Sequence, residues 1–177
     1  MSESKVKKFA VKTIHHDVYP AIDPRTTFKD SQEGKVVLIT GASQGIGKAV
    51  ALAFAHAGVR GLSLCSLSIE SVSTKLEKEL KEIQPNIQLI FMNVDVRKQE
   101  DVEKWFQITK EQLGTIDVLV NNAGTAETIP RKIHESDVDE YWTTFEVNIK
   151  GTYVVTRQFL KQEDGKGTII NTSSVGS

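Results

Sequence analysis

The sequence lacks the features by which secreted, membrane-spanning and nucleic-acid-binding proteins are recognised. It has a single cysteine, Cys65, among 177 residues, which excludes an internal disulfide framework and metal sites of the CxxC type. No stretch of about 18 apolar residues is present, so no membrane-spanning helix is predicted. The amino terminus has no apolar core of about 7–15 residues, and a secretory signal is therefore not expected. Lysine and arginine (22) balance aspartate and glutamate (23), so no strong field favours nucleic acid or an anionic membrane as a partner.

Residues 1–34 show no sustained hydrophobic period and are expected to form an extension rather than a domain. Pro20, Pro24 and Gly34 interrupt this stretch, as is typical of irregular segments. The adjacent pair His15 and His16 would point to opposite sides of an extended chain with no third ligand nearby, which predicts solvated histidines and no metal site. With 39% apolar and 25% charged residues, the remaining length fits one soluble domain, and a cytoplasmic location is expected by elimination.

From residue 35 onward, apolar runs alternate with segments of helical periodicity. The run at 36–39 is continuous and β-branched, typical of a strand buried on both faces of a parallel sheet. Strands are predicted near 36–39, 62–65, 87–94, 116–120 and 168–171, and helices near 45–57, 69–83, 102–113 and 138–160. Such alternation predicts an α/β fold, a doubly wound parallel sheet of Rossmann type with strand order 3-2-1-4-5. A ligand is expected in the crevice at the carboxyl ends of strands one and four.

Three glycines, Gly41, Gly45 and Gly47, separate the first predicted strand from the helix that follows it. Such glycines let the backbone turn tightly and approach a pyrophosphate, to which the helix terminus presents free N–H groups and a partial positive charge. Glycines also end strands for steric reasons, so the spacing alone is weak support. Because the strand before and the helix after agree with it, the turn predicts dinucleotide binding.

The spacing Thr-Gly-x-x-x-Gly-x-Gly at 40–47 resembles the glycine turn of the short-chain dehydrogenase/reductase family. Three further matches follow in the family's order: Asn-Asn-Ala-Gly at 121–124, the asparagine of the fourth helix at Asn148, and Ile-Asn-Thr-Ser-Ser at 170–174. The resemblance covers residues 35–177 and implies an NAD(P)-dependent oxidoreductase that moves a hydride between carbonyl and hydroxyl groups. Its partners would be a nicotinamide dinucleotide and a small carbonyl or alcohol substrate, and a homo-oligomer is left open.

The resemblance also implies roles for individual residues. The implied cofactor-binding residues are Gly41, Ser43, Gly45, Ile46, Gly47, Ser66, Asp95, Val96, Asn121, Ala123 and Gly124. Within this set the glycine turn would hold the pyrophosphate, and Asn121 and Ala123 would line the adenosine and ribose. Asp95 would hydrogen-bond the adenine, and the alternative for it is a turn or helix N-cap before Arg97. Asn148 would shape a helix kink and hold a proton-relay water, and Ser174 would orient the substrate oxygen.

The sequence departs from the family at the catalytic pair Tyr-x-x-x-Lys, which in the family follows the serine by about a dozen residues. Tyr19, Tyr141 and Tyr153 have no lysine four positions later. The domain at 35–177 is therefore expected to be carboxy-terminally incomplete and to supply the cofactor-binding half of such an oxidoreductase, with little catalysis of its own. The alternative is a non-catalytic nucleotide-binding fragment or pseudoenzyme.

The cofactor preference should be set at the end of the second strand, at 65–68. This stretch contains no acid that could hold the ribose 2′-hydroxyl and no arginine that could hold a 2′-phosphate. Because Ser66 and Ser68 can donate hydrogen bonds to a phosphate, NADP is favoured over NAD, with NAD left open. The sequence does not indicate which carbonyl or alcohol is the substrate.

Overall fold

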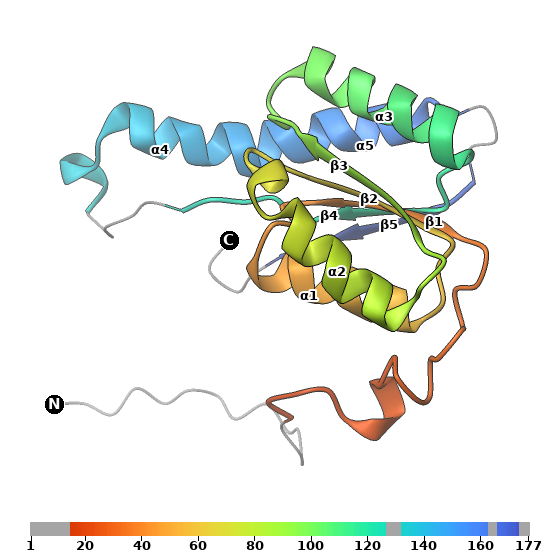
Figure 1. Ribbon diagram of the computed structural model, residues 1–177. Coiled ribbons are helices and arrows are strands. Elements are labelled where there is room, and N and C mark those ends of the chain that lie inside the picture. Colours follow the sequence, from red (N-terminus) through yellow and green to blue (C-terminus); the bar gives the residue numbers. More distant parts are fainter. Residues whose placement is uncertain (1–14, 127–131, 163–165, 174–177) are drawn as a thin grey trace, which may run out of the picture.

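The computed structural model describes residues 15–126, 132–162 and 166–173. Its main elements are β1 (Val36–Thr40), α1 (Gly45–His56), β2 (Gly61–Ser66), α2 (Ser73–Ile83), β3 (Gln88–Asn93), α3 (Gln99–Leu113), β4 (Val118–Asn121), α4 (Val138–Phe145), α5 (Thr152–Leu160) and β5 (Thr168–Asn171). The strands form one parallel sheet in the order β3-β2-β1-β4-β5. This order confirms the predicted doubly wound fold of Rossmann type. In Figure 1, α1 and α2 cover one face of the sheet, and α3 and α5 cover the other.

The central strand β1 contributes to the apolar cores on both faces of the sheet. Val36 and Leu38 pack in the cluster that contains Trp105 of α3, whereas Val37 and Ile39 pack in the cluster on the side of α1 and α2. Side chains alternate along a strand, so a strand with helices over both faces is apolar at most of its positions. The run at 36–39 is apolar without a break because its side chains are buried on both faces of the sheet.

The second helix begins later than the periodicity predicts. Ile69–Ser71 forms a 3-10 turn, η2, and α2 begins at Ser73. The hydroxyls of Ser71 and Ser73 each donate to a backbone carbonyl oxygen three residues earlier. Serine side chains compete in this way with the regular helical pattern. Ile69 is nevertheless fully buried and anchors the turn to the core.

The long helix predicted near 138–160 is interrupted by a π-helical turn, η4 (Glu146–Gly151), which joins α4 to α5. A π turn is wider than an α turn and changes the direction of the side chains that follow. The apolar side chains of Trp142 and Ile149 are 62% and 60% exposed, and the buried apolar side chains of α5 are Val155 and Phe159. Among the described residues, no helix has the length and apolar character to cross a membrane.

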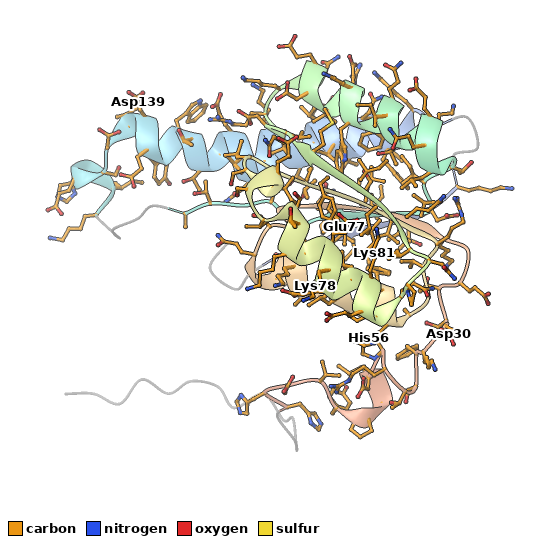
Figure 2. The ribbon with its side chains drawn as sticks, viewed as in Figure 1. Asp30, His56, Glu77, Lys78, Lys81 and Asp139 are labelled. Carbon is orange, nitrogen blue, oxygen red and sulfur yellow. The ribbon has the colours of Figure 1, made fainter. Side chains whose placement is uncertain are left out.

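Residues 15–34 include a 3-10 turn, η1 (Pro20–Ile22), and Asp30 and Gln32 contact the chain just after α1. The N–H of Gln32 donates to the carbonyl oxygen of Ala57 over 2.8 Å. Asp30 packs so closely on Gly58 that a Cβ added to this glycine would lie 2.9 Å from Asp30 Cα. Figure 2 shows Asp30 at this junction, near the end of α1. Pro24 and Phe28 of the same segment also line a groove beside α1, so the segment contacts the domain at the end of α1 and along its side.

Candidate functional site

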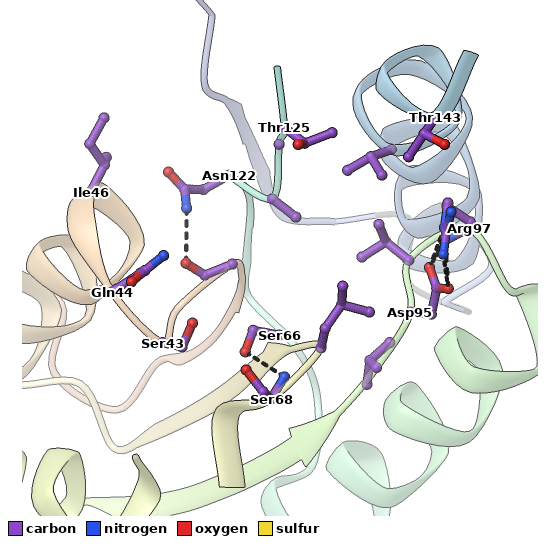
Figure 3. Close-up of a pocket in the computed structure, with 17 residues that line it drawn as sticks. Ser43, Gln44, Ile46, Ser66, Ser68, Asp95, Arg97, Asn122, Thr125 and Thr143 are labelled. Carbon is purple, nitrogen blue, oxygen red and sulfur yellow. Dashed lines mark hydrogen bonds and ion pairs between the residues drawn. The ribbon is translucent and has the colours of Figure 1, made fainter. Parts of the chain in front are cut away.

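A cavity of about 550 Å³ opens at the carboxyl ends of the central strands, where the strand order reverses. Its walls are the loops that follow β1, β2, β3 and β4, together with one side of α4 and η4 (Figure 3). This is the crevice in which the sequence predicts a ligand. Chain segments that are far apart in the sequence meet here because parallel strands all end at the same edge of the sheet.

The turn after β1 combines a tight backbone with an uncapped helix terminus. Gly41 has a φ of 67°, and a Cβ at this position would lie 2.9 Å from the Cα of Ala123, so only glycine fits. Gln44 is the N-cap of α1, and its side chain makes no capping hydrogen bond. Ser43, Gln44 and Ile46 line the cavity at this point. The first N–H groups of the helix and the positive end of its dipole would therefore stabilise an anionic group such as a pyrophosphate.

Thr40 and Asn122 lock this turn to the loop after β4. The Thr40 hydroxyl accepts hydrogen bonds from the backbone N–H groups of Asn122 and Ala123, each over 2.9 Å. The side-chain amide of Asn122 donates in return to the carbonyl oxygens of Thr40 and Gly41, over 3.1 and 3.3 Å. Thr40 is buried, so these bonds are shielded from competing water. They fix the width of the crevice between the two loops.

The two adjacent asparagines at the end of β4 have different surroundings. Asn121 is 5% exposed, and its Nδ2 donates to Thr156 Oγ1 over 3.0 Å and to Asn171 Oδ1 over 2.9 Å. The side chain of Asn121 is thus held by α5 and β5, whereas Asn122 lines the cavity. Consecutive side chains of a strand point to opposite sides, so the two residues cannot share one role. The predicted adenosine contact of Asn121 stays a prediction, and Asn122 is the asparagine that the fold brings to the crevice.

Asp95 follows β3 and is paired with Arg97. Nε and Nη2 of Arg97 donate to the two carboxylate oxygens over 2.9 and 2.7 Å, and the backbone N–H of Arg97 donates to Oδ1 over 3.0 Å. These hydrogen bonds hold the pKa of the Asp95 carboxyl below its ordinary value, although partial burial acts to raise it. The backbone contact is that of a turn, and the N-cap of α3 is Lys98. Asp95 and Val96 also line the cavity, so the adenine contact stays a prediction.

Asn148 lies in η4 and is bound to the loop after β4. Its Oδ1 accepts from the N–H of Thr125 over 2.9 Å, and its Nδ2 donates to the carbonyl oxygen of Thr125 over 2.8 Å. The hydroxyl of Thr152 donates to the backbone carbonyl oxygen of Asn148 over 2.8 Å. Asn148 lies within the π-helical turn, and its parts in shaping a helix kink and in a proton relay stay predictions. Ser174 lies outside the described residues.

The cavity collects most of the residues that the sequence assigns to a cofactor. Those that line it are Gly41, Ser43, Ile46, Ser66, Asp95, Val96, Ala123 and Gly124. The other assigned residues within the described part of the chain, Gly45, Gly47, Asn121 and Asn148, are not among the lining residues. The lining residues that the sequence did not indicate are Leu67, Val94, Arg97, Asn122, Thr125, Thr143 and Val147. Five of these seven residues lie within four positions of the end of a strand, which is a signal that could have found them. Thr143 and Val147 come from α4 and η4, which only the fold brings near. The described residues contain no cluster of side chains that could hold a metal ion.

Sequence comparison relates the chain to fungal proteins of known family. A family model described as short chain dehydrogenase matches residues 35–177. A short chain dehydrogenase of Monascus purpureus is 37% identical over 172 residues, which cover 94% of the chain and 57% of the relative. A short chain dehydrogenase of Emericella variicolor is 35% identical over 181 residues, which cover 98% of the chain and 59% of the relative. The chain thus spans just over half the length of these relatives, and the alignments reach into residues 1–34.

Solved structures share the fold over most of the chain. An alcohol dehydrogenase from the archaeon Thermococcus sibiricus, complexed with 5-hydroxy-NADP, has a TM-score of 0.73 and 34% identity, with 80% of this chain and 59% of that chain covered. An actinorhodin polyketide ketoreductase with NADPH has a TM-score of 0.72 and 32% identity, with coverages of 84% and 55%. An NAD+-bound xylitol dehydrogenase has a TM-score of 0.74 and 28% identity, with coverages of 81% and 54%.

Proposed function

The chain belongs to the short-chain dehydrogenase family, and on this premise we propose that it forms the dinucleotide-binding part of an NAD(P)-dependent oxidoreductase. The observation that carries the proposal is the turn at Gly41 beside the uncapped amino terminus of α1, at the mouth of the cavity. Such a terminus stabilises a diphosphate through its backbone N–H groups and its dipole. Because the chain spans just over half the length of its relatives, the reaction is itself part of the proposal.

The residues of the cavity fit a dinucleotide. A Cβ at Gly45 would meet no atom within 4 Å, which leaves room beside the helix terminus for a pyrophosphate. Leu67 and Val96 both line the cavity and would flank the adenine with apolar surface. The Asp95 carboxylate, whose pKa the hydrogen bonds from Arg97 hold below its ordinary value, would accept a hydrogen bond from the purine amino group.

Within this proposal the favoured cofactor is NADP. Ser66 Oγ accepts a hydrogen bond from the N–H of Ser68 over 3.2 Å. The hydroxyl hydrogen of Ser66 is not used in this bond and can be donated to a 2′-phosphate. The only acid that lines the cavity within the described residues is Asp95, which Arg97 neutralises. Two of the similar structures are described with NADPH or an NADP analogue and one with NAD+, so the preference rests mainly on Ser66.

The proposed reaction is reduction of a small carbonyl compound or oxidation of the matching alcohol. A bound nicotinamide would supply the hydride or accept it. The part of this chain is to bind the dinucleotide and to hold the loop of Thr125 at the cavity edge through Asn148. Asn148 is proposed to hold a relay water, and Ser174 to orient the substrate oxygen by donating a hydrogen bond where negative charge develops.

Titration of the purified chain with NADP+ and NAD+, followed by calorimetry and by the melting temperature, tests the proposal. We expect saturable binding, tighter for NADP+, with stabilisation of about 2.7 kcal/mol when the ligand is at 100 times its Kd. Gly45→Asp places a carboxylate where the pyrophosphate would lie and should abolish binding. Gly34→Asp is the matched control, because Gly34 also has a positive φ and no atom within 4 Å of an added Cβ but lies in the extension. Absence of binding by the wild type, or undiminished binding by Gly45→Asp, would overturn the proposal.

A further inference from the structure

The loop 95–97 packs against the π-helical turn η4. Val96 lies beside Gly151, where an added Cβ would come within 2.6 Å of Val96 Cγ2. Both residues are buried. Only glycine lets the main chain of η4 approach Val96 so closely, and any larger residue would push the loop away from the turn. The position of this loop in the cavity wall therefore depends on η4.

Arg97 adds a charged connection between the same two segments. Its Nε and Nη2 donate to Oδ1 and Oδ2 of Asp95 over 2.9 and 2.7 Å, a fork geometry that lysine cannot reproduce. Its Nη1 lies 3.6 Å from Oε2 of Glu146, the first residue of η4. The Arg97 and Asp95 side chains are 31% and 11% exposed, so water only partly screens the pair. Figure 3 shows Arg97 between Asp95 and the helix that bears Thr143.

The same turn also supports the other wall of the cavity. Asn148, in η4, makes two hydrogen bonds with the backbone of Thr125. Gly124 lies so close that an added Cβ would be 3.3 Å from Asn148 Oδ1. One π-helical turn thus contacts both 95–97 and 123–125, and Arg97 is the one cationic side chain that lines the cavity within the described residues.

We propose that Arg97 is a positioning residue for the adenine-binding end of the cavity. This inference rests on the proposed function and adds to it a residue that sets recognition of the purine. Arg97 occupies lone pairs on both oxygens of Asp95, so the carboxylate cannot rotate freely, and the ion pair with Glu146 holds the loop on η4. The carboxylate then meets the purine amino group in a single orientation, which lowers the entropy lost on binding.

The proposal has a consequence for the pH dependence of binding. Hydrogen bonds from Arg97 lower the pKa of Asp95, whereas partial burial raises it. The other charged groups around Asp95 are Lys98, which also lowers its pKa, Asp101, which accepts from the Asp95 backbone N–H over 3.2 Å, and Glu146, which acts through Arg97. Without Arg97 the effect of burial remains and the pKa of Asp95 rises. Binding that needs the ionised carboxylate would then be lost at a higher pH on acidification.

The test is titration of the 177-residue chain with NADP+ and with nicotinamide hypoxanthine dinucleotide phosphate, in which a carbonyl oxygen replaces the purine amino group. The wild type is expected to prefer NADP+, because a carboxylate repels that oxygen. Arg97→Gln should lose about tenfold in affinity for NADP+, the scale of one hydrogen bond to a charged group, and little for the analogue. Arg97→Lys keeps the charge without the fork and should fall between. In Arg97→Gln, the acidic limb of NADP+ binding should move to higher pH.

Arg60→Gln is the matched control for loss of a hydrogen-bonded arginine. Arg60 donates to Gly34, Gln88 and Leu113 and lies before β2, at the edge of the sheet opposite the cavity. We expect this variant to melt at a lower temperature with an unchanged preference for adenine. A purely structural role of Arg97 would give the same pattern in Arg97→Gln.

The outcomes separate the two proposals. If the wild type binds neither dinucleotide, the proposed function fails. If the wild type binds both equally, or if Arg97→Gln keeps the full preference and the wild-type pH limb, the inference about Arg97 alone is overturned. Should Arg97→Gln not fold, Glu146→Gln decides, since it removes the ion pairs of Glu146 with Arg97 and with the exposed Lys150 and leaves the hydrogen bonds between Arg97 and Asp95 in place. That variant should lose about twofold to threefold in affinity for NADP+, and an unchanged affinity would overturn the inference.

Discussion

The side-chain amide of Asn122 donates a hydrogen bond to the carbonyl oxygen of Gly41 over 3.3 Å. The residues lie in the loops that follow β4 and β1, and both line the cavity. The distance between these loops decides whether a diphosphate can contact the amino terminus of α1. Asn122 therefore contributes to the site through the shape of the turn rather than through charge.

Asn122→Ala removes the hydrogen bonds to this turn and should weaken dinucleotide binding. We expect the affinity to fall about tenfold and the free energy of unfolding to fall by about 1 kcal/mol, the scale of a net hydrogen bond. Calorimetric titration and urea denaturation measure the two effects. Asn86→Ala is the control, because Asn86 is an exposed residue of the turn before β3. An Asn122→Ala variant that binds as tightly as this control would contradict the assigned role.

The central strands could be predicted from the sequence because both of their faces are covered. A buried parallel strand is largely apolar, as the unbroken run in β1 shows, and the fifth strand, predicted near 168–171, is found at Thr168–Asn171. The glycine turn could be predicted because the backbone at Gly41 has a positive φ and a close neighbour, which exclude other residues. The alternation of strands and helices predicts a doubly wound parallel sheet, for which the observed strand order is a common one.

The details of the cavity wall could not be predicted in the same way. Helical periodicity does not show where a π turn is inserted, so η4 (Glu146–Gly151) was hidden within one long pattern. The sequence does not distinguish the two consecutive asparagines. Asn121 is the last residue of β4 and Asn122 the first residue of the loop after it, and this position brings Asn122 to the cavity. The pairing of Arg97 with Asp95 depends on the turn that joins them. Aspartate and arginine occur in many kinds of loop, so their presence in the sequence does not predict this turn.

Ser63→Ala should destabilise the fold through a buried polar cluster between β2 and α3. The Ser63 hydroxyl accepts from Trp105 Nε1 over 2.8 Å and is hydrogen-bonded to Thr109 Oγ1 over 2.7 Å. The three residues are fully buried, so the variant leaves the indole N–H without a partner. The free energy of unfolding should fall by about 1–3 kcal/mol, measured by urea denaturation. Ser71→Ala, which removes an exposed hydroxyl, is the control. An equal loss of stability in both variants would show that burial of the Ser63 cluster is not the cause.

Ser66→Asp should reverse the proposed cofactor preference. A carboxylate at this position would repel a 2′-phosphate and accept a hydrogen bond from the ribose 2′-hydroxyl of NAD+. We expect the affinity for NADP+ to fall by about tenfold or more, as for a like-charge contact of about 1.4 kcal/mol, and the affinity for NAD+ to be retained or improved. The ratio of the two Kd values is the measurement. Thr74→Asp adds the same charge on the exposed side of α2 and should leave the ratio unchanged, so a matching shift there would point to net charge instead.

The edge strand β5 should make the chain self-associate. β5 is the last strand of the sheet, Ile170 is 43% exposed, and together with Thr168 it lines a groove beside α1. An uncovered strand edge with apolar side chains tends to pair with a strand of another chain. We therefore expect concentration-dependent dimers or aggregates at micromolar concentration, detected by sedimentation velocity and light scattering.

Ile170→Lys tests whether this edge is the cause. A lysine on an edge strand must lose its hydration when a second strand pairs there, so the variant should shift the distribution toward monomer. Ile133→Lys is the matched control, since Ile133 is 77% exposed in a 3-10 turn, η3 (Ile133–Glu135), outside the sheet. If both variants disperse the chain equally, added charge explains the effect. A wild-type chain that stays a monodisperse monomer over the same range would contradict the prediction. It would show that the exposed edge of β5 and the groove beside α1 are stable in water without a partner.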